Sequence, residues 1–372
     1  MVHRKTRQYP GKQRVDEGLL LVYLITLVAG LAMIYSTSSI LAEARFGSHL
    51  YFLRNQVLWV ALSLITITII CKLDLSKVAI YSPLAFLLVL VSLGVVFLMP
   101  ERNGAHRWLE LGPLTIQPSE LFKFAMIFFL AFSFSNQKRN ITDSRQLLRR
   151  HVPLVGSGLL LILLEPDLGT TMVVFVTALG MFYLAGARIK HLLTALVPLL
   201  GTAAFVVFGL GYKKARVMDY LYSVLDPLKG SYQAKQSALT LGAGGIFGVG
   251  FGDGRQKLFF LPYPHTDFAF ASMGEEIGLV GLMIVLGCLY YIIRRGLKIA
   301  AAQPDRFGYL LASGMTLSLF INCAINIGVV TCLLPVTGLA LPFFSYGGSS
   351  LLVSSAAVGV LLNLSKRTGK RI

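Results

Sequence analysis

Chemically active side chains gather in one short stretch of this sequence, His-Thr-Asp-Phe at residues 265–268. Asp267 lies among phenylalanines and directly before a long apolar segment, so its carboxylate loses hydration unless another group compensates. Ionisable groups in such surroundings are often functional, and a carboxylate of this kind can act as a general base. The same carboxylate could instead cap the helix that follows, by accepting a hydrogen bond from a free backbone N–H. The stretch alone leaves both interpretations open.

An oppositely charged pair, Glu120 and Lys123, lies three positions apart at the start of another apolar segment. At this spacing both side chains lie on the same side of a helix and can form an ion pair. A lysine at the centre of a bilayer costs roughly 2.5–3.5 kcal/mol, and less toward its edge, so the pair could simply make this helix end tolerable. Alternatively, Lys123 is directed at an anion bound inside the helix bundle. The pair is expected on the same side of the membrane as Asp267, which favours the second interpretation.

Two loops carry further candidates. Asp167 precedes Gly169-Thr170-Thr171, an arrangement typical of a helix N-cap. Seven glycines fall between Gly242 and Gly254, next to Arg255 and Lys257. They do not form a Walker loop, because no Gly-Lys-Ser/Thr follows. Backbone N–H groups of such a loop could nevertheless bind phosphate.

Membrane spans are the elements that must position these residues. Of 372 residues, 55% are hydrophobic and 14% are charged, against about 25% charged residues in a soluble domain. The apolar residues form long runs, not the alternating short strands of a membrane barrel. The predicted fold class is therefore an all-α polytopic membrane protein. We predict ten spans, at residues 17–37, 56–72, 79–99, 118–135, 147–164, 169–186, 191–211, 271–293, 309–331 and 345–364.

The net charge of +17 is explained first by topology. Lys and Arg collect in the short cytoplasmic loops of membrane proteins, and here they gather in the tails and in the loops on the same side. We therefore predict one domain, 1–372, with cytoplasmic tails at 1–16 and 365–372 and a large outer loop at 212–270. Basic residues in that loop suit either a bound lipid phosphate or ordinary anionic headgroups. No nucleic acid is needed to explain the charge.

Several segments together resemble the SEDS family (shape, elongation, division and sporulation) over residues 19–364. They are NGAHRWLELGPLTIQPSELFK, EPDLGT, YQAKQSALTLGAGGIFGVGFG, KLFFLPYPHTDF, GEEIGLVG and NIGVVTCLLPVTGLALPFFSYGGSS. The end of the last segment is more similar to the division branch, FtsW, than to the elongation branch, RodA. The resemblance implies ten spans, cytoplasmic termini, a large outer loop between spans seven and eight, and a place in the bacterial cytoplasmic membrane at the division septum.

An activity is implied by the same resemblance. Family members polymerise the lipid-linked peptidoglycan precursor, lipid II, into glycan strands. A class B penicillin-binding protein that crosslinks the strands is the implied partner, together with other division proteins. The essential aspartate of the family falls at Asp267, and Tyr263 departs from the pattern, because many members carry Glu there. Further family positions match at Arg107, Glu120, Lys123, Asp167, Arg216 and Gln236.

The implied reaction joins a sugar 4-hydroxyl to the anomeric carbon of a sugar-pyrophosphoryl-lipid. Since pyrophosphate leaves as a stable anion, one base and a cationic clamp suffice, and a single inverting displacement is the economical route. We predict that Asp267 is the base. The clamp candidates are Arg107, Lys123, Arg216 and Lys257. A divalent cation, Mg²⁺ or Mn²⁺, could share the work of the clamp, although no cluster of His or carboxylate residues demands one.

Other functions remain open at this point. A lipid II flippase could use Glu120, Lys123 and Asp167 to line a polar path through the bundle. A flippase, however, needs polar groups throughout the membrane depth, whereas these gather toward one side. A non-catalytic scaffold for division proteins would not need an aspartate at the boundary between loop and membrane. The elongation role of the RodA branch is a further alternative.

Overall fold

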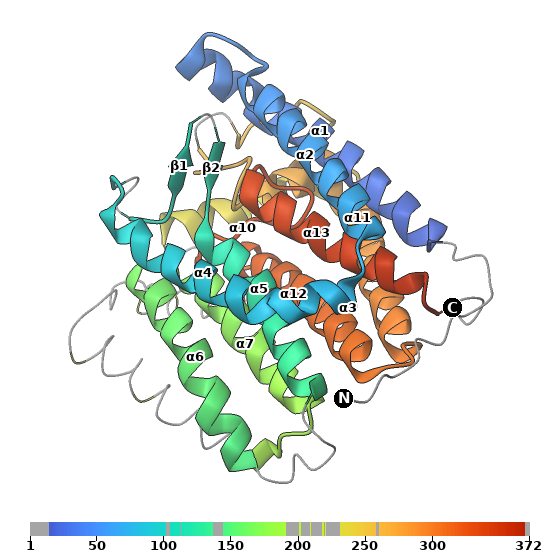
Figure 1. The fold of residues 1–372 in the computed structure, drawn as a ribbon. Helices are drawn as coiled ribbons and strands as arrows, with labels where there is room; N and C mark the ends of the chain where they lie inside the picture. Colours follow the sequence, from blue (N-terminus) through green and yellow to red (C-terminus); the bar gives the residue numbers. More distant parts are fainter. Residues whose placement is uncertain are drawn as a thin grey trace.

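The structure, a computed structural model, is almost entirely helical (Figure 1). It describes residues 15–101, 105–112, 114–136, 144–190, 231–257 and 260–368, with single positions at 201, 209, 218 and 220. Within these ranges, seven helices are long and apolar enough to cross a membrane. They are α1 (Glu17–Phe46), α2 (Tyr51–Lys72), the segment Leu75–Leu98 that contains α3 (Leu75–Val78) and α4 (Ser82–Val95), α5 (Pro118–Asn136), α11 (Ala269–Ala301), α12 (Arg306–Val330) and α13 (Gly348–Ser365). Two further helices, α6 (Ser144–Leu164) and α7 (Leu168–Leu184), contain shorter apolar segments.

The all-α membrane fold that the apolar runs predict is confirmed. Nine of the ten predicted spans fall on these helices, and the seventh, 191–211, lies outside the described residues except for the single positions 201 and 209. The predicted outer loop is partly helical, because α10 (Tyr232–Gly244) forms within it. α1 is longer than predicted: its 30 residues measure about 45 Å, against a hydrocarbon thickness of about 30 Å. The last turns of α1 therefore project beyond the membrane core.

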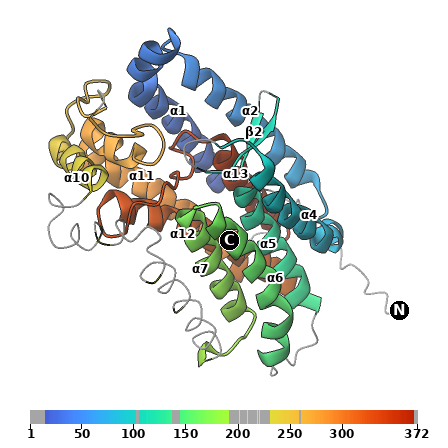
Figure 2. The same ribbon diagram turned by 90° about the vertical axis from the view of Figure 1, so that its left-hand side faces the viewer.

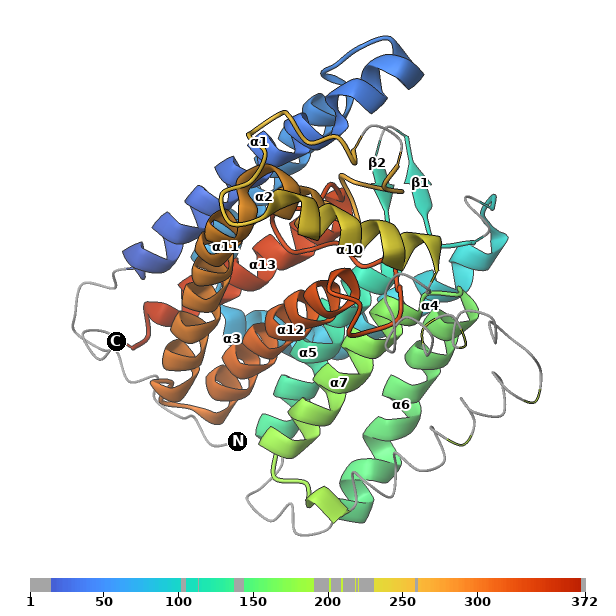
Figure 3. The same cartoon turned by 180° about the vertical axis from the view of Figure 1, so that it is seen from behind.

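The two ends of the bundle differ in structure. At one end, which we call the Asp267 end, lie α10, the turn that carries Asp267 and a hairpin of β1 (Leu109–Leu111) and β2 (Leu114–Ile116) (Figures 1 and 3). At the other, the terminal end, α1 begins and α13 ends. There Asp16 N–H donates to Ser365 Oγ at 3.0 Å, and Asp16 Oδ2 lies 2.7 Å from Arg295 Nη2. The Asn363 amide donates to carbonyl oxygens at the end of α2, so the terminal end is closed by polar contacts between four helices.

α5, α12 and α13 form the interior of the bundle (Figure 2), and 72–78% of each of these spans is buried. In the spans of α1, α2, α4 and α11, only 22–39% is buried. Close approach of α13 to α2 depends on small residues. A Cβ at Gly359 would lie 3.3 Å from Ile67 Cα, and one at Gly348 would overlap the Trp59 ring. Small residues along α13 therefore allow it to pack tightly against α2.

α11 is broken near its start. Gly278 has φ 64° and ψ −171°, outside the helical region, so residues 269–277 and 279–301 form two helical segments. The glycine-rich loop after α10 fills the break and joins it by four backbone hydrogen bonds of 2.9–3.1 Å. These bonds link Leu279 N to Gly245 O, Val280 N to Ile246 O, Val249 N to Glu275 O, and Gly250 N to Glu276 O. The N–H groups of Val249 and Gly250 are thus occupied by α11 and cannot bind phosphate.

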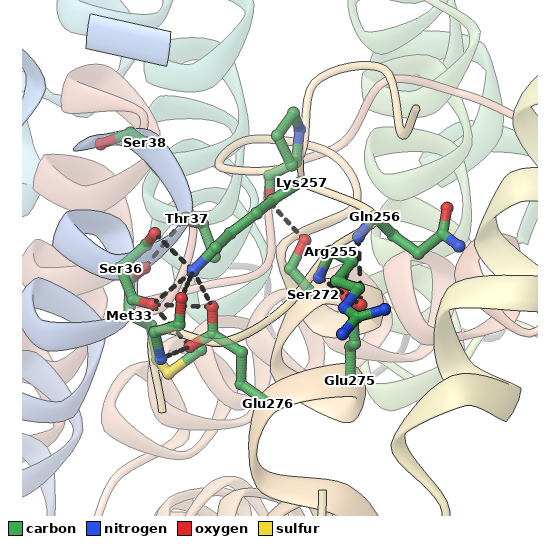
Figure 4. A network of polar contacts seen from close by, with 12 residues as sticks. Met33, Ser36, Thr37, Ser38, Arg255, Gln256, Lys257, Ser272, Glu275 and Glu276 are labelled. Atoms are coloured by element: carbon green, nitrogen blue, oxygen red, sulfur yellow. Dashed lines mark hydrogen bonds and ion pairs between the residues drawn. The ribbon is translucent and has the colours of Figure 1, made fainter. Parts of the chain in front are cut away.

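Buried polar contacts hold the next part of this loop (Figure 4). Glu276 Oε1 lies 2.7 Å from Lys257 Nζ and accepts a hydrogen bond from Ser36 Oγ of α1. Glu275 accepts from the backbone N–H groups of Arg255 and Gln256, at 2.7 and 3.0 Å. Because these contacts connect α1, α11 and the loop, they fix the chain about ten residues before Asp267.

Candidate active site

Asp267 lies in a tight turn directly before α11. The N–H groups of Thr266 and Phe268 donate to Tyr263 O, which closes the turn, and Tyr263 itself adopts a left-handed φ of 53°. The N-cap of α11 is Phe268, and no side chain caps this helix. The capping interpretation of Asp267 is therefore wrong, and its half-buried carboxylate is available for chemistry.

Contacts from three other parts of the bundle hold the turn. Asn326 of α12 donates from Nδ2 to the carbonyl oxygens of Asp267, at 3.0 Å, and of Leu339, at 2.6 Å. His265 O accepts from Tyr346 N–H at 2.7 Å, and the His265 ring lies 4.6 Å from that of Phe52 on α2. The turn that carries Asp267 is thus fixed through its backbone, which leaves the carboxylate free of a structural role.

A second set of polar residues interacts with Asp267 through its charges and comes from the segment before β1 and from the connection between α6 and α7. Arg107 donates from Nε to Glu165 O at 2.9 Å and from Nη2 to Pro166 O. Asp167 caps α7, as predicted, because Oδ1 accepts from Thr170 N–H at 3.0 Å. Asp167 Oδ2 accepts from Gln117 Nε2 at 2.9 Å, which ties the cap to the residue before α5.

The charges of these two groups act on one another. Burial, followed by the negative charge of Asp167, raises the pKa of Asp267 to about 6, with Arg107 and a hydrogen bond from Thr266 opposing the rise. A carboxylate with this pKa is mostly ionised at neutral pH yet more basic than a solvated aspartate. The three residues Arg107, Asp167 and Asp267, distant in sequence, therefore form one electrostatic unit.

Glu165 belongs to this unit and was missed by reasoning from the sequence. Its side chain is fully buried, and neither carboxylate oxygen has a hydrogen-bond partner in the described part of the chain. Burial, followed by the charge of Asp167, raises the pKa of Glu165 to about 8, with Arg107 opposing. The group is thus a neutral acid at pH 7. Its signal in the sequence was a second acid two positions before Asp167, in a short loop between two spans.

Glu120 and Lys123 form the ion pair that their spacing predicts. Lys123 Nζ lies 2.8 Å from both carboxylate oxygens of Glu120, and both side chains are buried. A small cavity of about 20 Å³ beside Lys123 is lined also by Asn322 of α12 and Ser354 of α13. Glu120 lies about one helical turn after Gln117, the residue that donates a hydrogen bond to Asp167. Its contact with a bound anion remains a prediction.

The remaining predicted site residues lie apart from Asp267 or outside the described ranges. Lys257 is buried in its ion pair with Glu276 and also donates to the carbonyl oxygens of Ser36 and Gly252. These partners occupy its ammonium group, so it has no donor left for a phosphate. Gln236 lies half-buried on α10, and Arg216 lies outside the described residues.

A metal could be held here only with help from the substrate. Among the described residues, no three His, Cys, Asp or Glu side chains converge as a ligand set. Asp267 interacts electrostatically with Asp167, but Asp167 already accepts hydrogen bonds on both oxygens. A divalent cation would therefore need phosphate oxygens to complete its coordination.

Comparison with known proteins extends over nearly the whole chain. Residues 17–370 match a family model described as cell cycle protein, which groups FtsW, RodA and SpoVE. Stage V sporulation protein E of Bacillus subtilis is 41% identical over 365 residues, covering 95% of this chain and 98% of that protein. A protein of Geobacter metallireducens named "Probable peptidoglycan glycosyltransferase FtsW" is 36% identical over 358 residues, covering 95% of this chain and 96% of that protein.

Solved structures agree with this relationship. A chain from a peptidoglycan synthase complex, described as coordinating polymerization and crosslinking, has a TM-score of 0.78 at 27% identity and covers 96% of this chain and 99% of its own length. The rod shape determining protein RodA of Thermus thermophilus has a TM-score of 0.70 at 27% identity, covering 95% of this chain and 97% of that one. The matches include the division, elongation and sporulation branches, so they support the preference for FtsW only weakly. This chain belongs to the FtsW/RodA/SpoVE family of cell cycle proteins, the SEDS family.

Proposed function

We propose that this protein is a glycosyltransferase that polymerises lipid II into glycan strands, with Asp267 as the general base. The observation that carries the proposal is a half-buried carboxylate, Asp267, whose pKa is raised and which interacts with the charge of Arg107. Two comparisons support it: relatives named as probable peptidoglycan glycosyltransferases, and the likeness to a chain of a complex that couples polymerization to crosslinking.

The chemistry follows from the charges at the site. Asp267 accepts the proton of the sugar 4-hydroxyl, whose oxygen attacks the anomeric carbon of the donor. The bond from that carbon to the pyrophosphate oxygen breaks, and the pyrophosphate leaves with the electron pair, which inverts the anomeric centre. Arg107 uses Nε and Nη2 to hold the loop before α7, and Nη1 lies outside these two hydrogen bonds, so it can contact the pyrophosphate.

Further substrate contacts are part of this proposal. Lys123, Arg216 and Gln236 bind the donor or acceptor, Glu120 orients Lys123, and Asp167 orients Gln117 and sets the charge around Asp267. When a Mg²⁺ or Mn²⁺ ion is bound, it neutralises charge on the leaving pyrophosphate. The inferred place is the outer face of the bacterial cytoplasmic membrane, at the division septum, with both termini in the cytoplasm. A class B penicillin-binding protein is the proposed crosslinking partner, among other division proteins.

The distribution of polar groups argues against a flippase. A flippase needs polar groups throughout the membrane depth, whereas those at the terminal end, Asp16, Arg295, Ser365 and Asn363, are occupied by contacts that join α1, α2, α11 and α13. The polar groups around Asp267 gather at the opposite end. Chemistry at one membrane surface therefore fits the structure better than transport across it.

Asp267→Asn tests the proposal, because the amide keeps the shape of the side chain but is not basic. We expect the rate of glycan strand formation from lipid II by the purified protein to fall by roughly 10²–10⁴-fold. The assay is run with and without the transpeptidase partner, and the amount of folded variant in the membrane is the control. Polymerisation near the parent rate would remove Asp267 from the mechanism and return the flippase and the scaffold to consideration.

A further inference from the structure

Apolar side chains crowd the surface of the glycine-rich loop at residues 245–252. Phe247 is 80% exposed, Ile246 61% and Phe251 55%. Glycines flank the pair Ile246-Phe247 on both sides, and they also flank Phe251. Exposed apolar surface on this scale marks a contact with another apolar phase or molecule. The position of the loop relative to the hydrocarbon core of the membrane decides whether that contact is lipid.

The depth follows from α11. Arg294 and Arg295 lie near the terminal end of this helix, and such residues mark the boundary of the hydrocarbon core. From Arg294 back to Leu279, where the unbroken part of the helix begins, about 15 residues measure about 22 Å, which is less than the core thickness of about 30 Å. Leu279 and Val280 then lie inside the core. The loop carbonyl groups that bond to them lie at the same depth.

Lipid-facing side chains of α11 continue the surface of the loop. Exposed fractions of 46–65% are found on one side of the helix just after the break, at Leu279, Val280, Met283 and Ile284. The loop residues Gly245 and Ile246 are hydrogen-bonded to the first two of these positions. The apolar surface of the loop is therefore continuous with the membrane-facing surface of a span.

Irregular backbone is tolerated at membrane depth only where its polar groups are satisfied by protein. Here the break in α11 supplies those partners, through the four backbone hydrogen bonds described above. Glycine makes the approach possible: at Gly248, where φ is 82°, a Cβ would collide with the carbonyl group of Glu276. The loop thus turns its polar backbone inward and its apolar side chains outward. Charged residues, Lys235, Asp253 and Arg255, appear only at its flanks.

We propose that residues 245–252 are an interfacial membrane anchor that inserts Ile246, Phe247 and Phe251 into the acyl region of the leaflet on the Asp267 side. The anchor sets the height of Asp267 above the membrane, because the same loop carries Lys257 into the contacts with Glu276 that precede the catalytic turn. Asp267, two residues before α11, then lies at the level of the lipid headgroups, where the pyrophosphate of a lipid-linked sugar resides.

Tryptophan fluorescence in vesicles tests the anchor without any measurement of activity, so its outcome is independent of the proposed glycosyltransferase function. Phe247→Trp and Phe251→Trp each place a probe in the loop of the full-length protein, and emission from Trp59 and Trp108 is subtracted with the parent protein. The vesicles contain phosphatidylcholine brominated on its acyl chains, which quenches tryptophan by contact. Ile284→Trp on the lipid-facing side of α11 is the positive control. His49→Trp, in the exposed turn beyond the projecting end of α1, is the aqueous control.

Both loop probes are expected to lose as much emission to the brominated lipid as Ile284→Trp does, and to resist quenching by aqueous iodide. A loop probe that is quenched by iodide like His49→Trp, or that the brominated lipid does not quench, overturns the proposal. If neither brominated lipid nor iodide quenches the loop probes, the loop is covered by protein, for example by a second copy of the chain, and not by lipid.

Discussion

Two carboxylates near Arg107 differ in charge at neutral pH. Asp267 has a pKa raised to about 6 and is mostly ionised, whereas Glu165 has a pKa raised to about 8 and is mostly protonated. His265 does not titrate in this range, because burial, with the charge of Arg45, lowers its pKa to about 4. The pH dependence of the site should therefore be set by the two carboxylates.

We expect the rate of polymerisation to rise as Asp267 ionises through about pH 6 and to fall as Glu165 ionises through about pH 8. The fall has a physical cause: an ionised Glu165 places a negative charge beside Arg107 and weakens its attraction for pyrophosphate. Glu165→Gln cannot ionise, so it should keep the rise and lose the fall. The measurement is kcat/KM for lipid II against pH in both proteins. An unchanged fall at high pH in the variant would show that Glu165 does not set it.

Among the elements, the broken α11 and the loop that fills it are the part of the fold that positions the turn with Asp267. The Lys257–Glu276 ion pair at its centre is buried on both sides, with side chains 4% and 0% exposed. Removing one partner leaves an uncompensated buried charge, whereas removing both does not. A structural ion pair is therefore recognised by a larger loss of stability when one partner is removed than when both are, which is not expected of a cation that only binds substrate.

Lys257→Ala should destabilise the protein by about 3–5 kcal/mol, and Lys257→Met combined with Glu276→Leu should cost less than the single change. The measurement is the thermal unfolding of each variant in detergent. Lys235→Ala is the matched control, because Lys235 is exposed on α10 and its removal should leave stability unchanged. If Lys257→Ala were as stable as the parent but inactive, Lys257 would be a substrate contact after all.

The sequence predicts these elements unevenly. Spans are predictable because each apolar run specifies its helix locally, and the cap at Asp167 is predictable because its partner, Thr170, lies three residues away. The break at Gly278 is not, because its hydrogen bonds join residues about 30 positions apart. Burial of ionisable residues is not predictable either. Lys257 and Glu165 are residue types that are usually exposed, and only the packed structure shows that both are enclosed.

At the scale of the whole molecule, the difference between the two ends predicts which end faces the cytoplasm. Reactive groups gather at the Asp267 end, and the terminal end is closed. A reporter that is active only outside the cytoplasm should therefore be active when fused after Ser231, at the start of α10, and silent when fused after Thr368. Expression of each fusion is the control. Activity after Thr368 would contradict the ten-span topology and place the reactive end in the cytoplasm.

The contacts of Asp16 have a consequence for how the protein is made. Its hydrogen-bond partner Ser365 lies 349 residues later in the chain, and Arg295 lies 279 residues later. At about 5–20 residues per second, the ribosome completes Ser365 roughly 20–70 s after Asp16. During that interval α1 is already in the membrane but lacks its neighbours at the terminal end. The first helix to be inserted is thus among the last to be locked in place, and membrane insertion and final assembly of this protein are separate events in time.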